Sequence, residues 1–130
     1  FLDAMADCDY LIPQYTPDYS TNSYWSLGVR YQGEKVNGVS WQDFRKRYMQ
    51  NGGDGIYGAW SVPYLEPVMS SKSFARRMPS IYNGLEYPQG LCPVAERIQS
   101  EMMVFKTNYR SLDLAKAKAD ALQKTIRDFE

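Results

Sequence analysis

The stretch GGDGIYGAWSVPYLEP, residues 52–67, sets how the rest of the chain is arranged. It opens with three glycines and an acid, continues through a short apolar run, and ends between Pro63 and Pro67. Closely spaced glycines permit positive φ angles and predict a sharp turn after a helix. The next residues favour a strand over 55–61, and Pro63 must either end this strand or lie on a sheet edge. Large rings gather where the chain leaves this strand, either for ordinary packing or for a binding site: Tyr57, Trp60 and Tyr64.

Length and composition predict one globular domain, because the chain has 130 residues and is 44% apolar. Its 15 acidic and 15 basic residues balance, so we expect neither nucleic acid nor a membrane surface as a partner. No apolar run approaches the roughly 20 residues of a membrane span, and we expect a cytoplasmic protein. Cys8 and Cys92 are too few for a disulfide framework, and free thiols are expected.

The chain contains no histidine. This removes the usual general base, the Ser-His and Cys-His nucleophiles and the commonest zinc ligand. There is no Walker loop, and the glycines of 52–55 follow a predicted helix, where a dinucleotide fingerprint would follow a strand. We therefore expect no metal site and no complete active site in this chain, and we assign no catalytic residue.

Hydrophobic periodicity predicts an α/β (α+β) fold with a small three-stranded sheet covered by helices. The strands are expected at 22–32, 55–61 and 103–107, and the helices at 41–51, 93–102 and 112–129. Along the first strand one face is apolar, formed by Trp25, Leu27, Val29 and Tyr31. A strand–helix–strand unit usually forms a parallel crossover, so strand order and direction stay open at this point.

Two serines stand where helix N-caps are expected. Ser40 precedes the helix at 41–51, with Asp43 in the position of a capping-box acid, and Ser111 precedes the last helix. That last helix has the strongest periodicity in the chain, and its alanines should allow a close approach to the strands. Its apolar seam consists of Leu112, Ala115, Ala119, Leu122, Ile126 and Phe129.

The two remaining regions are less regular. Apolar residues at helical spacing at the start predict the last turns of a helix, and prolines hold an extended connection up to residue 21. The chain begins without methionine, and we expect it to be a piece of a longer protein. Residues 68–90 predict a flexible or partner-ordered loop with a short helix near 73–78. Its Arg76 and Arg77 are either solvated or bind an anion.

Taken together, these segments resemble the C-terminal small domain of the DegT/DnrJ/EryC1/StrS aminotransferases. These are pyridoxal-phosphate enzymes of fold type I that usually aminate keto groups of nucleotide-linked sugars. The resemblance covers nearly the whole chain in the right order, and CPVAE followed by a strand and a terminal helix is its most distinctive part. It is carried by NSYWSLGVRY (22–31), WQDFRKRYMQNGGDGIYGAW (41–60), PYLEP (63–67), YPQGLCPVAERIQ (87–99) and the residues from Met103 onward.

The resemblance implies a division of labour with a larger domain that binds the cofactor. In the family that domain holds the Schiff-base lysine and most of the phosphate cup, so this piece alone should be inactive and bind no pyridoxal phosphate. The resemblance makes residues 1–21 the end of an interdomain helix with its linker, and 22–130 the small domain. It also implies a homodimer of the parent protein and a nucleotide-sugar substrate. The substrate-binding residues it suggests are Tyr57, Trp60, Ser61 and Tyr64.

One departure from the family pattern affects the substrate. Many members carry His-Tyr-Pro where this chain has Ser61, Val62 and Pro63. The rings of Trp60 and Tyr64 could cover a sugar or a base in compensation. A sugar is the expected substrate, and an inositol-like or other cyclic ketone is the alternative.

Two other functions compete with this hypothesis. One is a stand-alone binding or interaction module descended from such a domain, which the balanced charge and the aromatic loops permit. The other is a self-contained enzyme of unrelated chemistry, which the absence of histidine and of any catalytic cluster disfavours.

Overall fold

The structure, a computed structural model, describes residues 1–59, 61–82 and 84–130. These residues form two compact units. We call Phe1–Gly58 with Glu101–Glu130 the sheet unit, and Ala59–Ser100 the inserted segment.

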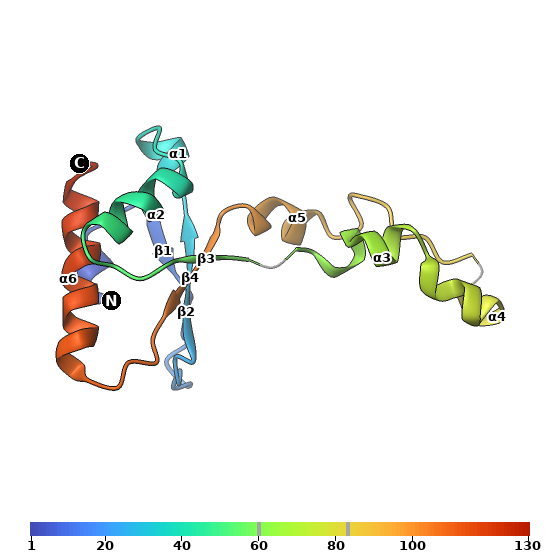
Figure 1. Ribbon diagram of the computed structural model, residues 1–130, viewed down its shortest axis with the longest axis horizontal. Helices are drawn as coiled ribbons and strands as arrows, with labels where there is room; N and C mark the ends of the chain where they lie inside the picture. The colour runs from blue at the N-terminus through green and yellow to red at the C-terminus, as the bar shows by residue number, and fades with distance from the viewer. Residues whose placement is uncertain (60, 83) are drawn as a thin grey trace. The chain divides into compact units, whose positions relative to one another are not determined.

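A four-stranded antiparallel sheet organises the sheet unit (Figure 1). Its strands are β1 (Leu11–Pro13), β2 (Ser26–Tyr31), β3 (Tyr57–Gly58) and β4 (Met102–Lys106), in the order β1-β2-β4-β3. The α+β class is confirmed, whereas the expected count of three strands is wrong. Residues 11–13, expected in a linker, pair with β2 because Leu11 is buried in the core, and Pro13 is tolerated on an edge strand. Every described pairing is antiparallel, so the parallel crossover does not form.

The helices of the sheet unit begin where the serine caps predict. At the start of α2 (Trp41–Gln50), Ser40 Oγ accepts a hydrogen bond of 3.1 Å from the Asp43 amide. At the start of α6 (Leu112–Arg127), Ser111 Oγ accepts one of 3.1 Å from the Leu114 amide. Each cap satisfies an amide that the first helical turn leaves without a partner. Two shorter elements complete the unit: the 3₁₀ turn η1 (Asp3–Met5) and α1 (Gly33–Val36).

The hydrophobic core lies between one face of the sheet and the helices α2 and α6, which lie on the same side of it (Figure 1). Alternate residues of β2 and β4 are buried, as the period of two along a strand requires. Each fully buried large apolar side chain contributes roughly 1.5–3 kcal/mol. The core includes Leu27, Val29, Tyr31, Phe44, Tyr48, Met103, Phe105, Leu122 and Ile126.

Trp25 does not join this face, contrary to the sequence prediction, and 88% of its surface is exposed. The strand begins only at Ser26, because Tyr24 adopts a left-handed φ of 49° that breaks the alternation. The Asn22 side chain accepts a hydrogen bond of 2.8 Å from the Tyr24 amide, and Thr107 Oγ1 donates to the Tyr24 and Trp25 carbonyl groups. The unusual backbone at Tyr24 is therefore held by three polar contacts.

The apolar seam of α6 is only partly buried. Leu122 and Ile126 pack in the core, but Leu112 is 73% exposed and the alanines at 115 and 119 are half-buried. The 16-residue helix is roughly 24 Å long, whereas a strand of five or six residues spans about 17–20 Å. The seam is thus buried mainly in the second half of α6, and the close approach of the alanines to the strands stays a prediction.

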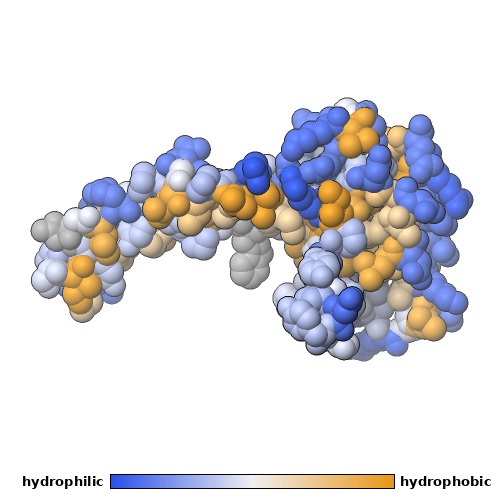
Figure 2. Space-filling view, turned by 180° about the vertical axis from the view of Figure 1, so that it is seen from behind, coloured by the Kyte–Doolittle hydropathy of each residue, from blue (hydrophilic) through white to orange (hydrophobic). Residues whose placement is uncertain are grey.

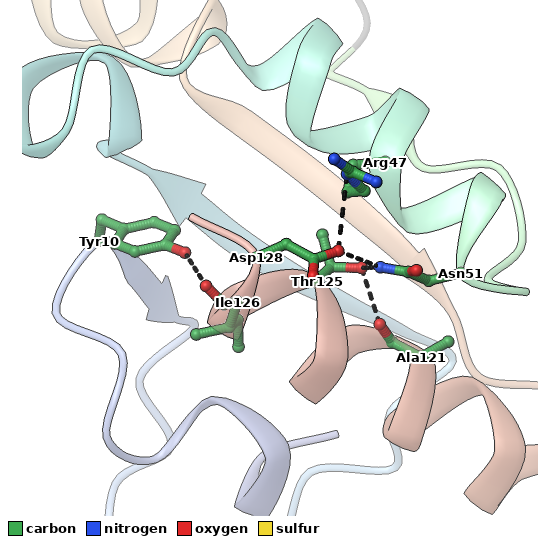
Figure 3. A network of polar contacts seen from close by, with 7 residues as sticks. All are labelled: Tyr10, Arg47, Asn51, Ala121, Thr125, Ile126 and Asp128. Carbon is green, nitrogen blue, oxygen red and sulfur yellow. Dashed lines mark hydrogen bonds and ion pairs between the residues drawn. The ribbon is translucent and has the colours of Figure 1, made fainter. Parts of the chain in front are cut away.

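A polar network joins the ends of α2 and α6 (Figure 3). Asn51 Nδ2 donates to Thr125 Oγ1 at 3.0 Å and to Asp128 Oδ2 at 2.8 Å. Thr125 Oγ1 donates to the Ala121 carbonyl at 2.7 Å, and Arg47 forms an ion pair with Asp128 at 3.5 Å. The buried Thr125 hydroxyl is therefore fully used, and Asn51 connects the two helices.

The inserted segment consists of short elements with almost no core. They are η2 (Pro63–Leu65), α3 (Pro67–Ser70), η3 (Ser73–Arg77), α4 (Pro79–Tyr82) and α5 (Pro93–Gln99). Among its described residues only Val62 is buried. The short helix expected near 73–78 is confirmed as η3. The helix expected at 93–102 to cover the sheet ends at Gln99 and belongs to this segment, because the chain enters β4 at Met102.

The two ends of the inserted segment attach to neighbouring strands. β3 and β4 pair antiparallel, with Gly58 opposite Met103, and the segment connects these two strands. It is therefore an insertion into a β-hairpin.

We expect the sheet unit to fold without the inserted segment. Replacing 59–100 by a short Gly-Asn-Gly linker should preserve the sheet and the core, because all strand pairings and core helices lie outside the deleted residues. Thermal unfolding followed by circular dichroism, with amide spectra of both proteins, tests this. Loss of a cooperative transition in the shortened protein would contradict it.

We expect the Asn51→Ala variant to be less stable by about 1–2 kcal/mol, since it leaves polar partners on α6 without their donor. The free energy of unfolding in urea is the measurement. Asn108→Ala, at an exposed position, is the matched control and should change it by less than about 0.5 kcal/mol.

Candidate functional site

The glycine-rich turn between α2 and β3 is the start of the candidate site. Gly52 has a φ of +98°, which side chains rarely tolerate. At Gly53, an added Cβ would lie 2.4 Å from the ring of Tyr48, so only glycine fits there. The sequence prediction of a sharp turn is confirmed. The two glycines are required for different reasons. Gly52 adopts a positive φ angle, and Gly53 leaves space for the ring of Tyr48.

Asp54 holds this turn to the rest of the sheet unit. Its Oδ2 atom accepts a hydrogen bond of 2.8 Å from the Tyr109 hydroxyl, and its Oδ1 atom lies 3.1 Å from Lys118 Nζ. Lys118 Nζ also donates to the Gly52 carbonyl at 2.8 Å. The ammonium group of Lys106 lies 5.3 Å from the centre of the Tyr109 ring. We call Asp54, Tyr109 and Lys118 the turn clamp.

The clamp fixes the protonation of two of its members at neutral pH. Partial burial alone would raise the pKa of Asp54, but hydrogen bonds from Tyr109 and Lys118 and the nearby ammonium groups outweigh it and lower that pKa. Burial and the hydrogen bond to Asp54 raise the pKa of Tyr109. Asp54 is thus a carboxylate and Tyr109 a phenol donor. The arrangement positions a turn, and it leaves no free base for proton transfer.

A second acid holds the other end of the insertion. Glu101 precedes β4, and its two oxygens accept hydrogen bonds of 2.6 Å from Arg30 Nε and from Lys35 Nζ. These hydrogen bonds and the two positive charges lower the pKa of Glu101. On each side of the inserted segment, the sheet unit therefore has an acid that contacts a cationic side chain: Asp54 before it and Glu101 after it.

The predicted substrate-binding residues are divided between the two units. Tyr57 lies on β3 of the sheet unit, with 64% of its surface exposed. Ser61 is exposed and Tyr64 is half-buried, and both belong to the inserted segment. Trp60 lies outside the described residues. The structure does not bring these side chains together within one unit.

Tyr64 takes part in a network inside the inserted segment. Its hydroxyl donates to Glu96 Oε1 and accepts a hydrogen bond of 2.8 Å from the Cys92 amide. Glu96 Oε1 also accepts one of 2.7 Å from the Gly90 amide. Burial and the bond to Glu96 raise the pKa of Tyr64. The hydroxyl is thus fully engaged, and what Tyr64 can offer a ligand is its ring.

Sequence reasoning missed most of these polar contacts. Tyr109 and Lys118 come from different segments than Asp54, and no spacing in the sequence connects them. Glu96 lies in the first turn of α5, where an acid suits the N-terminal end of a helix. Its bond to Tyr64 depends on how the intervening loop folds back. No local pattern encodes that contact.

We compared the residues that line two cavities with what pyridoxal phosphate needs. One, of about 430 Å³, contains Lys116 beside Asp3 and Asp120. The other, of about 290 Å³, contains Lys72, which forms an ion pair with Glu86. A cofactor phosphate needs several converging donors, whereas each cavity offers one ammonium group beside acids. These residues do not fit the cofactor.

Neither cysteine forms a disulfide in this structure. Among residues 1–59, 61–82 and 84–130, no three His, Cys, Asp or Glu side chains converge as metal ligands would. In the same residues, no helix combines the length and the apolar character needed to cross a membrane.

Comparison with known proteins yields no match to any family model, curated protein or solved structure.

We expect Asp54→Asn to lower the free energy of unfolding by about 1 kcal/mol at pH 7, because the ion pair with Lys118 is lost. The pKa of Asp54 is lower in the folded state than its unfolded value of about 3.9. Its contribution is therefore present above that value and disappears as the pH falls through the folded pKa. The difference between variant and parent should shrink towards pH 3.

Urea unfolding at pH 7 and pH 3 measures this difference. Asp7→Asn, at an exposed position, is the control and should match the parent at both values. A deficit in Asp54→Asn that is equal at the two pH values would show that the charge is not the cause.

Proposed function

We propose that this chain is the C-terminal small domain of a pyridoxal-phosphate aminotransferase of the DegT/DnrJ/EryC1/StrS type. In this proposal the full protein is a cytoplasmic homodimer that transfers an amino group to a keto group of a nucleotide-linked sugar. The support is the ordered series of resembling segments, together with an α+β unit in which α2 and α6 pack on one face of an antiparallel sheet.

The observation that carries the proposal is the lack of a core in the inserted segment. Ordering a backbone costs roughly 1–2 kcal/mol per residue, and buried apolar surface must offset that cost. Large apolar side chains instead lie on the surface of this segment (Figure 2). They include Leu65, Val68, Met78, Ile81, Leu85, Leu91 and Val94. A surface outside this segment would be expected to cover them, and the large domain of the same parent protein would provide one.

The residues proposed to contact the substrate are Tyr57, Trp60, Ser61 and Tyr64. The exposed ring of Tyr57 follows the turn that the clamp holds in place. Tyr64 would contribute its ring face, since its hydroxyl is bonded to Glu96. Ser61 would contribute a small hydroxyl donor or acceptor.

The cofactor in this proposal is bound by the large domain, which holds the Schiff-base lysine in the family, and the two cavity lysines of this chain, Lys72 and Lys116, lie beside acids. Pyridoxal phosphate, when bound there, supplies the electron-accepting chemistry of transamination. The contribution of this chain is to close one side of the cleft, exclude water and orient the sugar.

Cofactor trapping tests the proposal. The full-length protein, expressed from its complete gene, and this chain are each incubated with pyridoxal phosphate. Both are then reduced with borohydride and analysed by peptide mass spectrometry. We expect a modified lysine only in the upstream domain, and a visible-edge absorbance only in the full protein. Stoichiometric trapping on one lysine of this chain, or a gene whose start codon directly precedes Phe1, would overturn it.

A stand-alone binding module is the second candidate, and the same exposed apolar residues favour it. Hydrogen exchange separates the two candidates. If the proposal is right, amides of 59–100 should exchange at least about tenfold more slowly in the full protein than in this chain. Equal exchange in both would favour the module.

A further inference from the structure

The connection between β1 and β2 carries three large rings that are almost fully exposed. We call this connection, residues 14–25, the aromatic loop, and it lies at one end of the sheet (Figure 1). Tyr15, Tyr19 and Trp25 have 86%, 91% and 88% of their surface exposed. Single exposed apolar side chains are ordinary on a protein surface, whereas a concentration of large ones marks an interaction site. Three such rings on one connection form a concentration of this kind.

Hydrogen bonds fix the loop on the side of Tyr15. The preceding residue, Gln14, pairs twice with Gly28 of β2. Its amide donates to the Gly28 carbonyl, and its Oε1 atom accepts from the Gly28 amide, each at 2.9 Å. Further along, the Ser20 amide donates to the Pro17 carbonyl at 2.9 Å and closes a turn. The loop therefore presents its rings from backbone that is already ordered.

The exposure of Trp25 follows from the residue before it. Tyr24 has a left-handed φ of 49°, which is unfavourable for an aromatic residue and turns Trp25 out of the strand alternation. The Asn22 side chain and the Thr107 hydroxyl hold this backbone in place. Strained backbone that its surroundings maintain is frequent at sites that hold a ligand. The position of Trp25 is thus built by specific contacts.

Rings and uncharged polar groups dominate the composition of the aromatic loop. Its sequence is QYTPDYSTNSYW, in which four of twelve residues are aromatic and Asp18 is the only charged one. Six others have uncharged hydrogen-bonding side chains: Gln14, Thr16, Ser20, Thr21, Asn22 and Ser23. Antibody loops that recognise proteins have this mixture, because rings offer contact area at a low entropy cost and small polar groups adapt their hydrogen bonds.

The area of the three exposed rings indicates the size of the partner. Together they offer roughly 450–750 Å² of surface. This is most of the ~800 Å² that each partner contributes to a standard protein interface. A single sugar ring or another small ligand would leave most of this surface in contact with water. A polypeptide segment is long enough to cover it.

The charges around the loop indicate an uncharged segment. Asp18 is an exposed acid, whereas Lys106 lies opposite Ser26 at the start of β2, so neither sign dominates this end of the sheet. A strongly charged partner would lose its hydration here without gaining opposite charges in return.

The openness of the loop indicates an extended, proline-rich segment. Because each ring is so exposed, the rings do not enclose one another, and a ligand must lie across them. Proline-rich segments are already extended, and their prolines carry no N–H group that would lose its water without a new partner. Aromatic side chains are the usual binding surface for such segments.

We propose that the aromatic loop binds an uncharged, proline-rich segment of a separate protein. The contact goes beyond the proposed transamination and uses none of the residues assigned to it. The surface is smaller than a standard interface, so a dissociation constant of about 10–500 μM is expected.

Fluorescence anisotropy with a labelled peptide of three Pro-Pro-Leu-Pro repeats tests the proposal in this chain. Trp25→Ala and Tyr15→Ser should each raise its dissociation constant by at least about fivefold, because each removes a ring from the contact. Trp25→Tyr keeps a ring and should stay within about threefold of the parent. Leu112→Ala, at a position that is 73% exposed on α6, is the control and should leave binding unchanged.

Thermal unfolding should be the same in all these proteins, since the altered side chains are exposed. This separates a lost contact from a lost fold. A labelled peptide of the same length made of Gly and Ser should not bind, because it offers no apolar rings.

Four results would overturn the proposal. The first is a parent chain that does not bind the proline-rich peptide at concentrations up to about 1 mM, and the second is binding that persists in both ring variants. The third is displacement of the peptide by maltohexaose, which would indicate a glycan surface. The fourth is loss of binding in the full-length protein, which would assign the loop to a contact inside that protein. Cofactor trapping has a different readout, so the failure of one proposal leaves the other intact.

Discussion

The antiparallel pairing of β2 with β4 is the constraint on which the rest of the structure depends. Five residue pairs join these two strands, and β1 and β3 are added at their outer edges. A shift of one residue would turn Leu27, Val29 and Tyr31 away from α2 and α6, because successive side chains of a strand point to opposite faces. The register of this one pair therefore determines which side of the sheet has a core.

Polar contacts then fix what the sheet leaves undetermined. The register of β2 and β4 does not define how the chain enters β3 or β4 from outside. Asp54 and Glu101 define these entries, each by accepting hydrogen bonds from a cationic side chain. The same two acids attach the strand ends next to the inserted segment to neighbouring parts of the sheet unit. Order at these two points can coexist with a segment that has little core of its own.

Much of the secondary structure follows from local signals. The N-caps of α2 and α6 were predictable because a serine's hydroxyl satisfies an amide within the next turn, and this needs no tertiary information. Strand alternation in 26–31 was equally clear. The ends of the elements were harder to predict. β2 starts later than expected because Tyr24 adopts a left-handed φ angle, which is unusual for a tyrosine.

Tertiary packing explains the remaining errors. The strand at 11–13 contains a proline and is short, so only its pairing with β2 identifies it. Periodicity defined an apolar seam on α6, but it could not tell that Ala115 and Ala119 stay half-buried beside a cavity. The turn clamp and the Tyr64–Glu96 bond join residues distant in sequence. No single-sequence pattern reports such contacts, and the substrate-binding assignments stay predictions.

The placement of the inserted segment has a consequence for biosynthesis. β2 lies early in the chain, whereas its partner β4 follows the whole insertion, so the central pair has a high contact order. A ribosome must translate past residue 106 before β2 can find that partner. Until then, of the sheet and the two helices that cover it, only the β1–β2 pairing and α2 are complete on the nascent chain. The length of this loop adds little to the free-energy cost of pairing β2 with β4, because the entropy cost of loop closure grows only with the logarithm of length. The insertion therefore delays the pairing during synthesis. During that delay the apolar face of β2 is the surface that a chaperone would bind.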